Sequence, residues 1–346
     1  MPYRWGILVL AVSVVIPTRN RRTLLARALR TVLAQQDVNL EVVVVDEASE
    51  DGTADLVRGL SDPRVELVRH DAPKGVAAAR NSGLARARAP WVAFLDDDDL
   101  WAPTKLALQL QAAANVEAGW VCVGSVVVDE ALRIVSGTRP PPSHELPEIL
   151  SFNLVPGGGS GPMVRTELAR SVGGFDTGLS ILADWDMWIR LFLRTPPAFV
   201  YHPLVGYLRH HRSMSHLNQG FPDEFDRMAA KHAPARQTWG VQLSRERWLR
   251  WAAAMHVRSG NRREAFRTYV YLARYYRDAK SLARAALGVL FPKLMMRYWR
   301  WNALRLLPPG WYEEGEAWLA PIREQLLAED AATLSHPPQY RCLSTG

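Results

Sequence analysis

The sequence predicts an α/β protein in which a Rossmann-like, mostly parallel sheet is flanked by helices and followed by an all-α C-terminal region. Two observations predict this class. Short β-branched runs alternate with amphipathic stretches through the first half of the chain, as in sheets built from right-handed crossovers. Beyond about residue 225 only helical periodicity remains. We therefore expect a domain over 1–224, with halves at about 1–100 and 101–224, a helical region over 225–335 and a tail over 336–346.

The elements of the first half follow one another in regular order. Residues 11–17 are a β-branched run that Pro17 closes, and the next helix carries an apolar stripe made of Leu24, Leu25, Ala28, Leu29, Val32 and Leu33. A second buried strand is predicted over 41–46, and further strands are predicted over 64–70 and 91–96. The intervening helices run through Leu56 and Val57 and over 75–89, and another helix should begin near Pro103.

Polar side chains gather where three of these strands end. Residues 18–20 follow the first strand, Asp46 and Glu47 follow the second, and Asp96 to Asp99 follow the fourth. Open parallel sheets bind their ligands at the carboxyl ends of the strands, so these clusters should share one edge. The alignment predicts a ligand site there.

The run WVAFLDDDDLW over 91–101 is the most informative segment, because an apolar strand opens directly into four carboxylates. Side chains alternate along an extended chain, so Asp96 and Asp98 should project together and Asp97 elsewhere. Like charges repel unless a cation lies among them. Mg²⁺ or Mn²⁺ usually takes one or two carboxylates and fills its shell with water and substrate phosphates. The run therefore suggests a metal site for a nucleotide diphosphate; the alternative is an acidic surface turn in which Asp99 caps the next helix.

Composition bounds the class of protein. The chain has 346 residues, and 48% of them are hydrophobic, which allows a sizeable core. Its formal charge of +7 suits anionic lipid, phosphorylated substrates or nucleic acid. The basic segments contain no nucleic-acid-binding module, so no nucleic acid partner is expected. Two distant cysteines argue against a disulfide framework, and no apolar run is long enough to cross a bilayer. We expect a cytoplasmic protein that is soluble or lies peripherally at the inner face of the plasma membrane.

Five segments occur in the order found in family 2 glycosyltransferases, and the chain resembles that family and its GT-A fold. The segments are VSVVIPTRNR, VVVVDEASEDGT, KGVAAARNSGLARARAPWVAFLDDDDLW, GGFD over 173–176 and ADWDMWIRL over 183–191. Any one alone would be weak, but five in register over about residues 12–215 are specific. The resemblance implies a GT-A catalytic domain over 1–224, whose first half binds a nucleotide sugar and whose second half binds the acceptor.

The resemblance assigns the base and ribose of the donor to the loop after the first strand and the acidic pair after the second. These roles fall to Pro17, Thr18, Arg19, Asp46 and Glu47. The family usually has Asp where this chain has Glu47. It often has an aromatic residue in place of Arg19, although a guanidinium can also stack on a base.

The resemblance places the diphosphate and the metal on the following helix and the acidic run. Arg80 offers a planar fork to phosphate, with an ordinary surface arginine as the alternative. Asp96, with Asp97 beside it, faces the ribose, and Asp98 binds Mn²⁺ or Mg²⁺. The segment YLRHHRSMS approximates a late histidine pattern of the family and adds His210 as a metal ligand. The alternative is that this lone loop histidine is structural or solvated.

Inverting glycosyl transfer needs a base that accepts the proton of the acceptor hydroxyl while a metal stabilises the leaving diphosphate. In the family, Glu-Asp usually precedes a tryptophan, and that Asp is the base. The resemblance therefore assigns the base to Asp184, and Ala183 stands in place of the Glu. Asp186 is expected to cap the helix or to pair with Arg190. The stretch PGGGSGP over 156–162 lacks the lysine and spacing of a phosphate-cradling loop and suggests a flexible loop on the acceptor side.

The helical region ends in a basic aromatic segment. From Lys293, the stretch KLMMRYWRWNALRLL mixes aromatic and aliphatic residues with Arg297, Arg300 and Arg305. Such a helix can lie in a membrane interface. The alternative is a helix packed on the catalytic domain with solvated arginines.

We therefore expect an inverting, metal-dependent, non-processive glycosyltransferase. It would move a single sugar from a nucleoside diphosphate sugar, with a UDP-sugar favoured, to a hydroxyl of a glycan, a lipid-linked sugar or a small molecule. One alternative is a sugar nucleotidyltransferase, but its glycine-rich nucleotide loop near the first strand is missing. Another is a degenerate nucleotide-sugar-binding protein, which Glu47 and Ala183 allow but the retention of Asp96, Asp98 and Asp184 disfavours.

Overall fold

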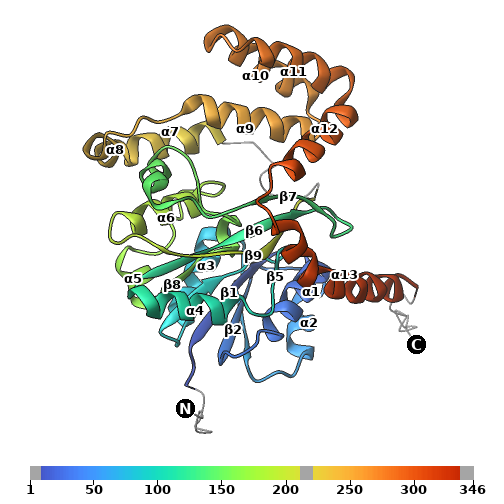
Figure 1. The fold of residues 1–346 in the computed structure, drawn as a ribbon. Coiled ribbons are helices and arrows are strands. Elements are labelled where there is room, and N and C mark those ends of the chain that lie inside the picture. The colour runs from blue at the N-terminus through green and yellow to red at the C-terminus, as the bar shows by residue number, and fades with distance from the viewer. Residues whose placement is uncertain (1–8, 211–220, 336–346) are drawn as a thin grey trace.

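The computed structural model describes residues 9–210 and 221–335 (Figure 1). The predicted tail over 336–346 and the end of the YLRHHRSMS segment lie outside the described residues. The first half of the chain forms the expected strand–helix repeat. Its elements are β1 (Val12–Thr18), α1 (Arg22–Leu33), β2 (Leu40–Asp46), α2 (Thr53–Gly59), β3 (Val65–Arg69), α3 (Val76–Arg86) and β4 (Trp91–Phe94).

These four strands are parallel, with β1 between β2 and β4 and with β3 outside β2. Their apolar residues alternate between two cores because successive side chains point to opposite faces of a strand. Val15 packs in one core, whereas Val14 and Ile16 pack in the other. Helices cover both faces, as a sheet of this kind requires (Figure 1).

The second half extends the sheet with both parallel and antiparallel strands. It contains β5 (Leu100–Trp101), α4 (Lys105–Val116), β6 (Trp120–Val128), β7 (Ile134–Thr138), the 3₁₀ helices η1 (Ser143–Leu150) and η2 (Gly158–Ser160), β8 (Met163–Arg165), α5 (Thr166–Ser171), α6 (Ala183–Phe192) and β9 (Ala198–Leu208). The strand order is β3-β2-β1-β4-β8-β6-β9-β5, and β7 pairs with β6. β8 is antiparallel to β4 and to β6. The sheet is thus mixed, and only its first half has the uniform parallel pairing that the repeat predicts.

The C-terminal helices pack on the sheet-containing part of the chain at both ends of the helical region. They are α7 (Phe221–Lys231), α8 (Ala233–Trp239), α9 (Arg245–Arg258), α10 (Arg262–Tyr275), α11 (Ala279–Leu290), α12 (Pro292–Arg305) and α13 (Trp311–Ser335). On α7 and α9, Phe225 and Trp248 pack into the core that holds Trp185 of α6. On α13, the Trp311 indole donates to the Ser125 carbonyl of β6 at 3.2 Å. The predicted boundary near residue 225 stays a prediction, since contacts cross it.

The middle of the helical region makes its own small core. Buried residues from α9, α10, α11 and α12 form this cluster, which includes Ala253, Tyr269 and Met295. In Figure 1, α10 and α11 lie far from the sheet. No helix in the described part of the chain has the length and apolarity needed to cross a membrane.

Candidate active site

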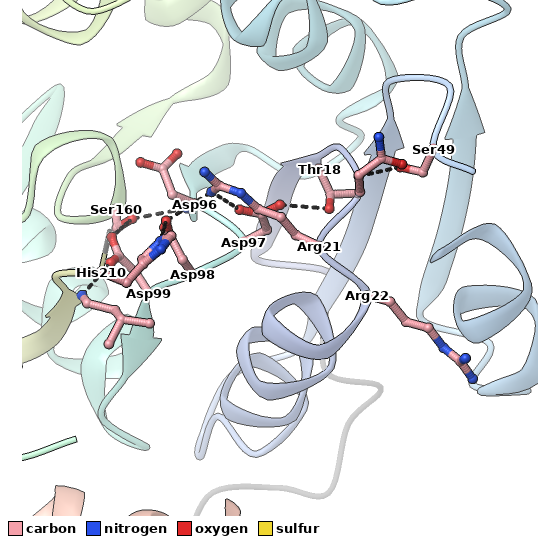
Figure 2. Close-up of polar contacts among 12 residues, drawn as sticks. Thr18, Arg21, Arg22, Ser49, Asp96, Asp97, Asp98, Asp99, Ser160 and His210 are labelled. Atoms are coloured by element: carbon pink, nitrogen blue, oxygen red, sulfur yellow. Dashed lines mark hydrogen bonds and ion pairs between the residues drawn. The ribbon is translucent and has the colours of Figure 1, made fainter. Parts of the chain in front are cut away.

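The carboxyl ends of β1, β2 and β4 bring the predicted polar clusters together. Thr18 and Asp46 are direct neighbours in the parallel register of β1 and β2. The Thr18 hydroxyl donates to Asp97 Oδ2 at 2.7 Å, across the gap between β1 and the segment after β4. Thr18, Asp46 and Asp97 are all buried. The edge predicted from strand order is therefore a real convergence of side chains (Figure 2).

The four aspartates form a turn and not an extended segment. β4 ends at Phe94, and the amide of Asp99 donates to the Asp96 carbonyl at 3.1 Å. The expectation that Asp96 and Asp98 project together is wrong, because the turn removes the alternation of a strand. Asp97 and Asp98 share a partner instead, since Arg21 Nη1 lies 2.8 Å from Asp97 Oδ1 and 2.9 Å from Asp98 Oδ2.

Asp99 also departs from its predicted alternative role as a helix cap. Its carboxylate accepts from the Ser160 hydroxyl at 2.6 Å and from the Leu208 amide at 2.9 Å. It thereby ties the acidic run to η2 and to the end of β9. Burial, followed by repulsion from Asp98 and Asp96, raises the pKa of Asp99 well above its usual value. Burial and repulsion from Asp98 raise the pKa of Asp97 to about 7.

The predicted metal ligands Asp98 and His210 are in direct contact. His210 Nε2 lies 2.8 Å from Asp98 Oδ2, although the two residues are 112 positions apart. Within the described residues, no three His, Cys, Asp or Glu side chains are grouped to hold a metal ion. A carboxylate and an imidazole nevertheless fit an ion that takes its remaining ligands from water and a diphosphate, as Mg²⁺ and Mn²⁺ sites commonly do.

Arg80 is a buried site residue and not an ordinary surface arginine. It is 4% exposed, it forms an ion pair with Asp96, and its guanidinium lies 5.1 Å from the centre of the Phe175 ring. Phe175 belongs to the GGFD segment, and Asn81 fixes it. The Asn81 amide donates to the Phe175 carbonyl at 2.8 Å and accepts from the Phe175 amide at 2.8 Å.

The glycine-rich loop packs against the acidic run, although we expected a flexible loop on the acceptor side. Ser160 accepts from the Asp96 amide at 3.0 Å. A Cβ at Gly159 would lie 2.6 Å from an Arg80 nitrogen, so a side chain there would displace the guanidinium. A Cβ at Gly158 would lie 3.4 Å from Asp184 Oδ2. Small residues here let the backbone approach both charged groups closely.

Asp184, the predicted base, lies at the start of α6 beside this loop. It accepts from the Trp185 amide at 2.6 Å and from the Asn153 side chain at 3.3 Å. Burial raises the pKa of Asp184 to about 6, and this effect outweighs the nearby Arg80 charge, which acts in the opposite direction. The carboxylate is therefore ionised at neutral pH, yet more basic than an exposed Asp.

The two carboxylates at the end of β2, Asp46 and Glu47, differ in how many of their oxygens accept hydrogen bonds. Glu47 contacts His70 and accepts from the amides of Lys74 at 2.8 Å and Gly75 at 2.6 Å, so both of its oxygens are occupied. Asp46 accepts from the Ser49 amide through Oδ1, whereas its buried Oδ2 lies 3.7 Å from Arg69 Nε and has no hydrogen-bond partner in the described part of the chain. Because of these contacts, Glu47 is better suited to hold the loop before α3 than to bind a ligand.

The remaining predicted donor contacts, Pro17 and Arg19, lie at the end of β1 and just after it. Pro17 is buried at the end of β1, and Arg19 is exposed just beyond it.

Reasoning from sequence missed Arg21, Asn153 and Ser160. Arg21 stands inside the first motif, and its charge beside an acidic run was an available signal. Asn153 and Ser160 contact their partners across 31 or more residues, and no local pattern indicates such pairs.

The site thus combines an acidic turn at the ligand edge of a mixed sheet, a buried arginine and a carboxylate of raised pKa. Residues 13–166 match the model of a family described as Glycosyl transferase family 2. The segment over 13–166 therefore belongs to this family, whose members are glycosyltransferases. The predicted family, fold class and enzyme class are thereby confirmed.

Two relatives and one solved structure show what the chain is similar to. It is 27% identical over 274 residues to the putative colanic acid biosynthesis glycosyl transferase WcaA of Escherichia coli K12, covering 72% of this chain and 95% of that protein. It is 37% identical over 99 residues to the UDP-Glc:alpha-D-GlcNAc-diphosphoundecaprenol beta-1,3-glucosyltransferase WfgD of Escherichia coli, which is 29% of this chain and 39% of WfgD. This chain thus spans only about two fifths of WfgD.

The structural likeness extends over most of the chain. The crystal structure of residues 1–349 of TarS from S. aureus, in complex with UDP-GlcNAc, superposes with a TM-score of 0.50 at 15% sequence identity. It covers 82% of this chain and 92% of that one. At this identity the likeness shows the fold alone.

Proposed function

We propose that the protein is an inverting, metal-dependent transferase that moves a single sugar from a UDP-sugar to a hydroxyl acceptor. One observation carries the proposal. A carboxylate of raised pKa, Asp184, lies beside the glycine-rich loop that also contacts Arg80 and Asp96 at the nucleotide edge of the sheet. A base at Asp184 would lie next to a region that suits a diphosphate.

The donor base is assigned from the open carboxylate oxygen. Asp46 Oδ2 faces Arg69 Nε only at 3.7 Å and has no hydrogen-bond donor in the described part of the chain, and an unsatisfied buried acceptor is costly. The imide N–H of uracil supplies such a donor, and the exposed Arg19 can stack on the base. WfgD is named for a UDP-Glc donor, and TarS has been solved with UDP-GlcNAc, which supports the same nucleotide here. Glu47 acts in this scheme by holding the loop that precedes α3.

The diphosphate is assigned to the acidic turn. Asp98 and His210 would hold Mn²⁺ or Mg²⁺, which when bound offsets the charge that develops on the leaving diphosphate. Asp96 and Asp97 frame the ribose side. Arg80, already desolvated, donates from a fixed position through a planar fork that suits phosphate oxygens.

The acceptor proton is assigned to Asp184. The Asn153 side chain and the Trp185 amide orient its carboxylate, and burial keeps it basic enough to take a proton. The acceptor hydroxyl attacks the anomeric carbon from the side opposite the diphosphate, which inverts the configuration. The acceptor O–H proton moves to Asp184 as the bond between carbon and the diphosphate oxygen breaks.

The acceptor class is assigned to a glycan or a lipid-linked sugar, with the enzyme in the cytoplasm and peripheral to the inner face of the plasma membrane. The support is the outer face of α12, where Leu294, Tyr298 and Trp301 are exposed along one stripe. Another side of α12 packs on the protein through Met295, so the packed helix of our alternative is also present. Residues 279–312 contain six Lys or Arg and no Asp or Glu. This charge suits an anionic leaflet.

A screen of nucleotide sugars tests the function. The wild-type protein is incubated with single UDP-, GDP- and dTDP-sugars without acceptor, with Mn²⁺ or with EDTA, and release of the free nucleotide is followed. We expect slow release from a UDP-sugar that needs the metal. Binding without release, or formation of a UDP-sugar from UTP and a sugar phosphate, would instead point to a degenerate binder or a nucleotidyltransferase.

A further inference from the structure

The sequence predicts a cation among the four aspartates of the acidic turn. In the structure, the Arg21 guanidinium lies there. A single nitrogen, Nη1, contacts Asp97 Oδ1 at 2.8 Å and Asp98 Oδ2 at 2.9 Å. The same Oδ2 atom of Asp98 is 2.8 Å from His210 Nε2. The oxygen assigned to the metal is thus already shared by two nitrogen groups of the protein (Figure 2).

The arrangement depends on this arginine and not on its neighbour. Arg21 immediately precedes α1, and its side chain turns towards the acidic run; its side chain is 23% exposed. Arg22 points the other way in Figure 2, and its guanidinium lies near Gly52. Two adjacent arginines therefore offer a matched pair, one on the acidic turn and one away from it.

A divalent ion at Asp98 would meet the Arg21 charge at close range. Repulsion between like charges in a partly buried site is strong, so the ion and the guanidinium cannot both keep their contacts with Oδ2. Arg21 can keep its contact with Asp97, but it loses Asp98, one of the two carboxylates that balance its charge. A diphosphate changes this balance, because its oxygens complete the metal shell and also give the guanidinium new acceptors.

We propose that Arg21 competes with the divalent ion for Asp98 and thereby makes tight metal binding depend on the nucleotide diphosphate. The inference rests on the proposed donor and metal site, and it adds a residue that orders their binding. Without nucleotide, the guanidinium holds the acidic turn together. With nucleotide, metal and diphosphate bind together, and each raises the affinity for the other by the same factor.

Manganese binding tests this without turnover. Free Mn²⁺ is measured by electron paramagnetic resonance in titrations of the wild-type protein, Arg21→Gln, Arg21→Lys and Arg22→Gln, each with and without UDP. UDP should tighten Mn²⁺ binding to the wild type by about 10-fold or more. Arg21→Gln should bind Mn²⁺ about 10-fold more tightly than the wild type when UDP is absent, and should lose most of the UDP dependence. Arg21→Lys, which keeps the charge, and Arg22→Gln should both resemble the wild type.

Two results would overturn the inference in distinguishable ways. If the wild type binds Mn²⁺ with UDP but Arg21→Gln binds Mn²⁺ alone no better than the wild type, Arg21 does not compete with the metal and the proposed function stands. If no variant binds Mn²⁺ even with UDP, the metal site itself is wrong, and the proposed function falls with it. Matching circular dichroism melts establish that each variant is folded.

Discussion

Asp184 and Asp186 stand two residues apart at the start of α6 but have opposite electrostatic surroundings. Two helical residues are about 200° of rotation apart, so their side chains leave the helix on different sides. Asp184 lies beside the glycine-rich loop, and burial raises its pKa to about 6. Asp186 is fully buried, with Arg190 at 2.6 Å and Lys231 and His232 at 2.8 Å. These partners hold its pKa well below the usual range even though burial acts in the opposite direction.

Asp184→Asn should strongly reduce catalysis but not donor binding. The amide keeps the shape of the side chain but cannot accept the acceptor proton, so kcat should fall by about 100-fold or more. Calorimetry with UDP and Mn²⁺ should give a dissociation constant within about threefold of the wild type, because Asp184 is not one of the residues assigned to the nucleotide or the metal. A large loss of UDP affinity with little change in kcat would reverse the assignment.

The pH profile of kcat/KM should fall on the acid side. Asp184 is protonated below its pKa, and a protonated carboxyl cannot act as base, so activity should rise with pH and level off above about 6. Asn153→Ala removes a hydrogen bond that favours the ionised form and should move this limb to higher pH. An acid limb that stayed in place in Asn153→Ala, or lay near pH 4, would mean that another group controls the reaction.

Asp186→Asn should destabilise the fold. The change leaves Arg190, Lys231 and His232 without their shared buried counter-charge, which costs about 3 kcal/mol in the free energy of unfolding. Since the pKa of Asp186 is lowered on folding, this stabilisation is present above the unfolded value near 4 and is lost only at lower pH. Urea unfolding at pH 7 measures the difference, and Asp226→Asn at an exposed ion pair provides the control, with an expected loss below about 1 kcal/mol.

Asp98→Ala should remove metal-dependent binding of UDP. The carboxylate is the oxygen ligand in the proposed site, and removing it leaves His210 alone for the ion. Calorimetry with and without Mn²⁺ should show that the metal increases UDP affinity of the wild type but not of the variant. Glu50→Ala, an exposed carboxylate near the end of β2, should behave as the wild type. Unchanged Mn²⁺ dependence in Asp98→Ala would remove this residue from the site.

The basic outer face of α12 should bind anionic vesicles. Each Lys or Arg near such a surface is worth about 1 kcal/mol, so Arg297→Gln with Arg300→Gln should weaken co-sedimentation by about 2 kcal/mol, or about 30-fold. Binding should also weaken with salt, because exposed charge is screened over about 10 Å at 0.1 M. Arg58→Gln with Arg64→Gln, near α2 and β3, controls for net charge. Equal losses in both double variants would leave α12 as a packing element.

The sequence was most informative where one strand carries its own pattern. β1 to β4 were placed within two residues of their ends, because β1 and β2 are β-branched runs and β3 and β4 follow in the same strand–helix repeat, which brings the carboxyl ends to one edge. Thr18, Asp46 and the acidic run therefore converge as expected. The predicted pairing of Asp186 with Arg190 is also present, because it depends only on helical spacing.

The parts that sequence did not reveal depend on distant contacts. β8 has three residues, too few for any periodicity to show, and its antiparallel pairing follows from the path of the chain and not from its composition. The turn at Asp97 was hidden because four identical residues carry no geometric preference. The contact between Arg21 and Asp97 joins positions 76 apart, and only the assembled sheet brings them together.

The helical region is fastened to the catalytic body twice, by α7 and α9 beside α6 and by α13 on the far strands of the sheet. The segment from α10 to α12 is consequently a span with two fixed ends and not a swinging arm. If its outer face rests on lipid, the height of Asp184 above the bilayer is constant. The enzyme would then select acceptors by the distance of their hydroxyl from the membrane. A hydroxyl one sugar closer to the headgroups, or one sugar farther away, would not reach Asp184, whatever the identity of the sugar that carries it.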